Sequence, residues 1–67
     1  MIYEEPSPKT ANEVPIGYEP IQTDMLKTEA LEIHREQFDR GSHPLLVIGQ
    51  SEARFDIWIP SESSRYW

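Results

Sequence analysis

The chain has 67 residues, of which 37% are hydrophobic, with a formal net charge of −6 and no cysteine. A chain of this length forms one domain at most and buries only about 60% of its extended surface, so its core must be small. The absence of cysteine excludes disulfides, thiolate nucleophiles and cysteine-ligated metals, and the acidic balance disfavours direct binding to nucleic acid or to an anionic membrane, since both need a basic patch.

Residues 1–13 are expected to form a flexible N-terminal arm. Pro6 and Pro8 favour extended conformations, and the stretch shows no apolar periodicity. Two interpretations remain open: a disordered leader, which is common at chain ends, or a docking arm anchored by Ile2 and Tyr3.

The next stretch, residues 14–18, alternates apolar and other side chains. Val14, Ile16 and Tyr18 would share one face of an extended strand. Pro15 cannot donate a hydrogen bond to a neighbouring strand, so such a strand would have to lie at a sheet edge. We expect an extra short edge strand here, or an extended segment that wraps the core.

The main helix is predicted from about Asp24 to Arg40. Thr23 or Asp24 can accept a hydrogen bond from the free amides of the first turn, and Gly41 suits the left-handed residue that ends many helices. At about 100° per residue, one face spans an arc of roughly 160° and is expected to be buried; it carries Leu26, Ala30, Leu31, Ile33, His34, Gln37 and Phe38.

The opposite side of this helix is acidic. Glu29, Glu32 and Glu36 are spaced three and four residues apart, so they form one column, with Asp39 beside it. Arg40 can pair with Glu36 at i, i+4. The column is either a solvated outer face, which is the usual case, or a negative stripe directed at a basic partner.

A β-hairpin is predicted over residues 45–59. Residues 45–48 form a continuous apolar run of strand length, and residues 49–53 form a glycine-containing turn. Residues 54–59 alternate, so that Phe55, Ile57 and Ile59 point one way. We expect the helix to pack across this face.

Trp58 would then point to the outer face, and the C-terminal tail, residues 61–67, ends in Tyr66 and Trp67. These aromatic side chains either form a small second cluster or an exposed patch that docks on a partner, because large aromatics are favoured as binding anchors. A free edge of the hairpin could also join two copies into one larger sheet, so a homodimer is a further hypothesis.

No sequence motif indicates catalysis or metal binding. His34 and His43 lie nine residues apart, which fits no zinc-site spacing. We therefore expect no catalytic residues, no metal and no cofactor, and we expect His34 to sit at the edge of the core. The N-terminus lacks a secretory pattern and no segment has the roughly twenty apolar residues of a membrane span, so a cytoplasmic location is expected.

The fold class predicted is α+β: a single small domain, with its core over residues 14–60, in which one amphipathic helix packs on a hairpin. The function expected is a non-enzymatic acidic protein-binding module. It would be a small inhibitor or regulator, of the kind that phages and mobile elements encode, and would occupy a basic surface of nucleic-acid-handling machinery through the acidic column (Glu29, Glu32, Glu36 and Asp39) and the aromatic side chains (Trp58, Tyr66 and Trp67). The alternative is an accessory subunit of a larger assembly that docks through its hairpin and aromatic tail.

Overall fold

The computed structural model describes residues 4–61. Predictions that concern residues 1–3 and 62–67, including the roles of Tyr66 and Trp67, lie outside this range. The described elements follow the order of a short 3-10 helix η1 (Ala11–Glu13), β1 (Tyr18–Met25), α1 (Lys27–Asp39), β2 (Leu45–Ile48) and β3 (Phe55–Pro60). One helix packs on a three-stranded antiparallel sheet, which confirms the predicted α+β class.

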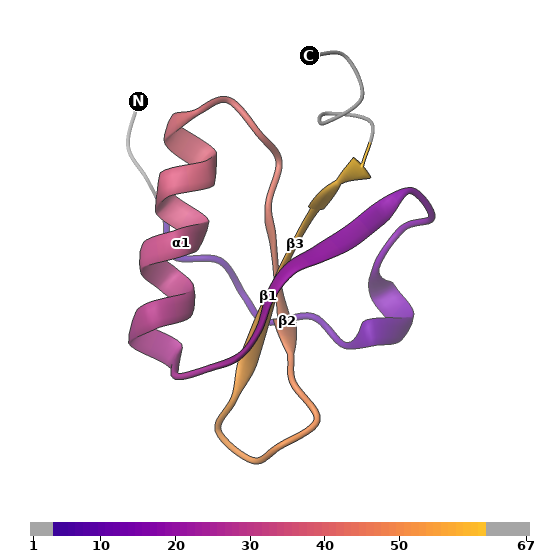
Figure 1. Cartoon of the computed structure of the whole chain (residues 1–67), viewed down its shortest axis with the longest axis vertical. Helices are drawn as coiled ribbons and strands as arrows, with labels where there is room; N and C mark the ends of the chain where they lie inside the picture. The colour runs from indigo at the N-terminus through magenta and orange to yellow at the C-terminus, as the bar shows by residue number, and fades with distance from the viewer. Residues whose placement is uncertain (1–3, 62–67) are drawn as a thin grey trace.

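The central strand of the sheet is β3. It pairs with β2 through the hairpin and with β1 on its other side, both antiparallel, so the strand order is β1-β3-β2. Strands β1 and β2 therefore run parallel to each other and are connected through α1. Figure 1 shows α1 on one side of the strands and η1 on the other.

The core lies between α1 and the sheet. Its buried side chains are Met25 at the end of β1, Ala30 on α1, Leu46 on β2 and Ile57 on β3. Ile57 has no exposed surface, and full burial of such a side chain stabilises the fold by about 1.5–3 kcal/mol. The predicted packing of the helix on the Phe55, Ile57 and Ile59 side of the hairpin is confirmed at Phe55 and Ile57.

Helix α1 starts three residues later than expected. The residue before its first turn is Leu26, and neither Thr23 nor Asp24 caps it. Asp24 belongs to β1 instead, where its φ of 56° breaks the extended backbone. The C-terminal end is as predicted: Gly41 has a φ of 85°, and the amides of Gly41 and Ser42 donate to the carbonyls of Phe38 and Gln37 at 3.0 Å.

Of the predicted strand at residues 14–18, only Tyr18 lies in a strand, as the first residue of β1, and the residues before it form a turn. The amide of Tyr18 donates to the carbonyl of Pro15 at 3.4 Å, and Gly17 takes a φ of 101°, which only glycine adopts readily. Ile16 at the tip is fully exposed. The extra edge strand exists as β1. It starts at Tyr18, the last residue of the predicted range.

Part of the expected N-terminal arm is hydrogen-bonded to the sheet. The amide of Lys9 donates to the Leu46 carbonyl, and the Lys9 carbonyl accepts from the Ile48 amide, both at 2.8 Å. Lys9 thus forms a parallel bridge with Val47 on the outer edge of β2. The hairpin edge assumed free for a homodimer is therefore occupied at this position, and the outer edge without a bridge within residues 4–61 is that of β1.

Candidate functional site

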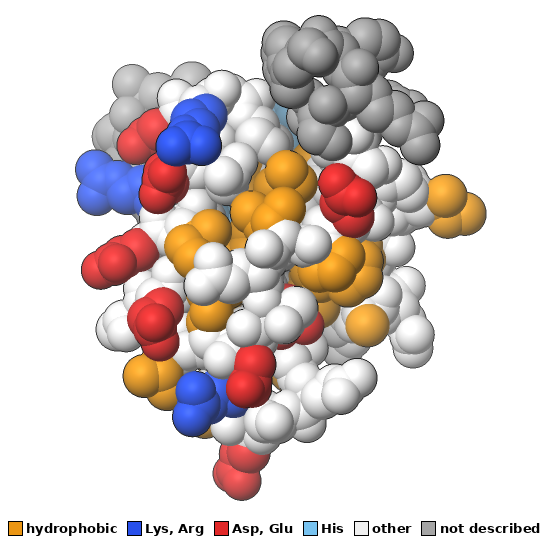
Figure 2. Space-filling view, in the orientation of Figure 1, with side chains coloured by type: hydrophobic (Ala, Val, Ile, Leu, Met, Phe, Trp, Pro, Cys, Tyr) orange, Lys and Arg blue, Asp and Glu red, His pale blue; other side chains and the backbone are white. Residues whose placement is uncertain are grey.

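The acidic column predicted on the helix lies along the exposed side of α1. All four of its carboxylates, Glu29, Glu32, Glu36 and Asp39, are solvent-exposed. Figure 2 shows acidic side chains following the outer side of this helix. Because one rigid helix carries all four, their spacing is set before any partner arrives.

Two of these carboxylates also make contacts within the chain. Glu36 Oε1 accepts from Arg40 Nη2 at 2.7 Å, a surface ion pair of the i, i+4 type that contributes about 0.3–0.5 kcal/mol. Glu29 Oε1 accepts from the Leu26 amide at 3.4 Å, at the positive end of the helix dipole. Arg40 therefore offsets part of the charge at the C-terminal end of the column.

Beside the acidic column lie apolar side chains that the core does not fully cover. Leu26 is 48% exposed and Ile21, on β1, is 38% exposed, while Ile33 on α1 and Ile59 on β3 are half-buried. Figure 2 shows apolar side chains on this side of the molecule, between α1 and the sheet. The prediction that Leu26 lies on the buried face of the helix is wrong, because the chain is still extended at that residue.

Trp58 follows the buried Ile57, so alternation places it on the other face of β3, and it is half-buried. It pairs with Leu45 on β2 and with Pro20 on β1. Its indole Nε1 is buried and finds no acceptor within residues 4–61. Tyr66 and Trp67, the other members of the predicted aromatic patch, lie outside the described range.

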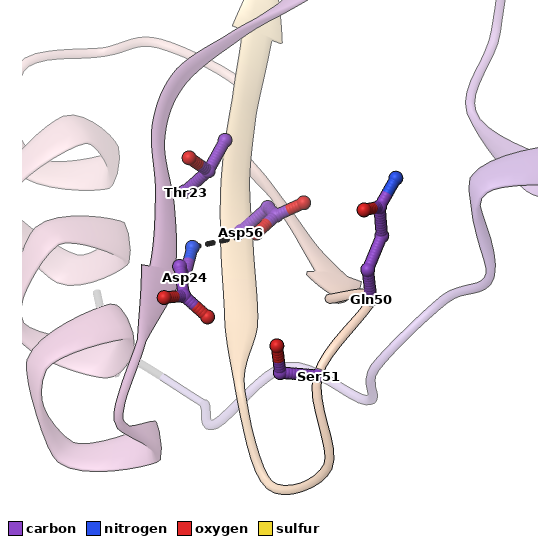
Figure 3. Close-up of a pocket in the computed structure, with 5 residues that line it drawn as sticks. All are labelled: Thr23, Asp24, Gln50, Ser51 and Asp56. Atoms are coloured by element: carbon purple, nitrogen blue, oxygen red, sulfur yellow. Dashed lines mark hydrogen bonds between the residues drawn. The ribbon is translucent and has the colours of Figure 1, made fainter.

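A polar pocket that the sequence did not indicate lies at the end of the sheet where the turn joins β2 to β3 (Figure 3). It has a volume of about 400 Å³ and is lined by Thr23, Asp24, Gln50, Ser51 and Asp56. Strand β1 has two breaks in its register with β3, between Pro20 and Gln22 and between Gln22 and Met25. The second break turns Asp24 so that its amide donates to Asp56 Oδ1 at 2.9 Å.

The lining of this pocket consists of oxygen and amide groups, with two carboxylates and no basic side chain. Such a lining suits a small group that donates hydrogen bonds. Three separate chain segments supply the five residues, so no spacing in the sequence could have indicated the pocket. Within residues 4–61, no three histidine or carboxylate side chains lie together as a metal site requires.

His34 is buried in the structure, with 6% of its surface exposed. Burial lowers the pKa of its imidazole below the ordinary value of 6.5, and a hydrogen bond to the backbone of Pro44 partly opposes this. Since proline has no amide hydrogen, the imidazole donates to the Pro44 carbonyl. His34 therefore joins α1 to the chain that leads into β2, as a core-edge residue, and His43 is exposed.

Comparisons of this chain with protein-family models, with curated proteins and with solved structures give no match. No helix in the described part of the chain is long and apolar enough to cross a bilayer.

Proposed function

We propose that this protein is a non-enzymatic acidic binding module that occupies a basic surface of a partner protein, as an inhibitor or regulator. The observation that carries the proposal is the row of four exposed carboxylates on α1 (Glu29, Glu32, Glu36 and Asp39). The chain as a whole has twice as many acidic as basic residues, 12 against 6. A surface of this sign attracts a basic partner and repels other acidic ones.

Basic surfaces are typical of proteins that handle nucleic acid, because phosphate binding needs clustered Lys and Arg. A small acidic domain seated on such a surface would compete with nucleic acid for it. This form of the proposal, which includes the phage or mobile-element setting, rests on charge and size.

The test is capture of partners from the native cell lysate by the tagged protein, at about 0.05 M and about 0.5 M salt. The binding of each captured protein is then measured with purified components. Replacing both Glu32 and Glu36 by Lys should weaken binding more than tenfold. The matched control replaces Glu4 and Glu52 by Lys. Both residues are exposed and lie outside α1, so this variant should weaken binding far less.

Two results would contradict the electrostatic mechanism. One is an affinity that does not change with salt. The other is an equal loss in both double variants, which would indicate that net charge matters and the position of the column does not.

A second function, an accessory subunit of a larger assembly, is favoured by a different observation. Ile16 is fully exposed at the tip of the Pro15–Gly17 turn, and the Gly17 carbonyl accepts hydrogen bonds from the amide and hydroxyl of Ser61 at 2.6 and 2.7 Å. A fixed turn presents an apolar side chain at low entropic cost. In that case Ile16→Ser should abolish assembly, and the two charge reversals on α1 should leave it intact.

A further inference from the structure

Helix α1 covers only part of the sheet. Helix α1 packs on β3 and β2, whereas six of the eight residues of β1 are exposed. A helix about 10 Å in diameter covers roughly two strands spaced about 4.8 Å apart. Within residues 4–61, the third strand, β1, therefore lacks a covering element on the side where α1 lies.

The uncovered surface has an apolar centre. We call it the α1–β1 face and define it by Ile21, Leu26, Ile33 and Ile59. Ile59 follows Ile57 by two residues and so shares its face of β3. Ile21 is the extra residue of the first register break and lies directly before Gln22, which pairs with Ile57. Ile21 and Leu26 are 38% and 48% exposed.

A partner strand is a poor occupant for this surface. Pro20 has no amide hydrogen to offer at the outer edge of β1. The two register breaks on either side of Gln22, and the positive φ of Asp24, interrupt the regular spacing of backbone groups that strand addition needs. An occupant must therefore dock through side chains, as a helix does when its apolar face lies against a groove.

The charges around the α1–β1 face select the chemistry of that helix. On the helical wheel, Glu29 and Glu36 lie next to Ile33. Glu29 also accepts a hydrogen bond from the amide of Leu26, and Glu19 lies exposed on β1. Acidic side chains thus border the apolar centre on both sides. A helix with an apolar stripe flanked by Lys or Arg matches this pattern, while an acidic helix would be repelled by the carboxylates.

We propose that the α1–β1 face binds a cationic amphipathic helix of the partner protein, which lies beside α1 and completes the helical layer over β1. This inference rests on the proposed function, because it names the surface and the kind of partner segment. The acidic column supplies long-range attraction, and the apolar centre supplies the contact.

The experiment uses a synthetic helical peptide of about 14 residues, composed of Leu and Lys with an apolar stripe of period 3.6. Its length matches that of α1, which has 13 residues. A second peptide has the same composition in an order that destroys the stripe. Binding to the full chain is followed by fluorescence anisotropy, and the contact surface is mapped by amide chemical shifts.

We expect the striped peptide to bind more tightly than its scrambled form and to shift the amides of Ile21, Leu26 and Ile33. Ile21→Ser and Leu26→Ser should each weaken it about threefold to tenfold, because each removes part of a buried apolar contact. The matched control is Ile48→Ser, since Ile48 is 49% exposed on β2, which β3 separates from β1, and it should leave binding unchanged. Circular dichroism verifies that each variant is folded.

Three outcomes would overturn the inference. The first is equal binding of both peptides, weakened by Glu32→Lys and not by Ile21→Ser. This result would agree with the proposed acidic binding module and would contradict binding of a helix at the α1–β1 face. Shifts confined to residues outside the α1–β1 face would place the binding helix elsewhere. No binding of either peptide at low salt would contradict the inference and the proposed function together.

Discussion

The backbone amide of Asp24 donates a hydrogen bond to Oδ1 of Asp56 at 2.9 Å, across the pair formed by β1 and β3. This contact holds Asp24 in the left-handed region, at a φ of 56°. It spans 32 positions of the chain, so it fixes the end of β1 immediately before α1 begins.

Removing this acceptor should destabilise the fold. Asp56→Ala leaves the Asp24 amide without its partner, and we expect a loss of about 1 kcal/mol in the free energy of unfolding, measured by urea denaturation. Asp56→Asn keeps a carbonyl oxygen at the same position and should lose less. Equal losses in the two variants would show that the charge of Asp56, and not the hydrogen bond, is what matters.

The core is small enough that truncating one buried side chain should remove a large part of the stability of the fold. A domain of 67 residues has a total stability of about 3–10 kcal/mol, and Ile57→Ala should cost about 2–5 kcal/mol. Ile57→Val should cost only about 0.5–1.5 kcal/mol. Ile48→Ala is the surface control, since Ile48 is half exposed, and its thermal midpoint should stay close to that of the unmodified chain.

The bridge at Lys9 should prevent the outer edge of β2 from pairing with another chain. Lys9→Pro removes the amide that donates to Leu46, so part of this edge becomes open to another chain. We expect reduced stability and association that increases with concentration in analytical ultracentrifugation. Lys9→Ala keeps both backbone hydrogen bonds and is the matched control. A monomeric Lys9→Pro variant of unchanged stability would mean that the bridge is dispensable.

Stability should fall on acidification because of His34. Burial lowers the pKa of the folded imidazole below 6.5, so the unfolded chain takes up its proton at a higher pH than the folded chain does. The contribution of neutral His34 is complete above pH 6.5, and it is lost as the pH falls from there through the lowered folded pKa.

The measurement is the free energy of unfolding at about pH 7.5 and about pH 5.5. His34→Gln, which cannot titrate, should show a smaller difference between the two. This window lies above the range of Glu13, whose pKa is lowered from 4.5 by hydrogen bonds with Thr10. An identical pH dependence in the His34→Gln variant would assign the effect to other groups.

The spacing of apolar and polar residues along short stretches of the sequence predicted much of the fold. The amphipathic period of residues 27–39 and the glycine at position 41 identified α1 and its end, and the alternation of Phe55 and Ile57 identified the face that meets the helix. The exposed acidic column followed from the same helical spacing. These features depend on neighbours within a few residues, so the sequence carries them directly.

Pairing between distant segments was decided only in the tertiary structure. The sequence contains nothing that places β3 at the centre of the sheet, or Lys9 against β2, because those bonds join backbone groups that every residue type except proline offers. The two register breaks in β1 remove the two-residue alternation that would have revealed the strand. The pocket around Asp24 and Asp56 exists for the same reason: its walls come from three segments that meet only after the sheet has formed.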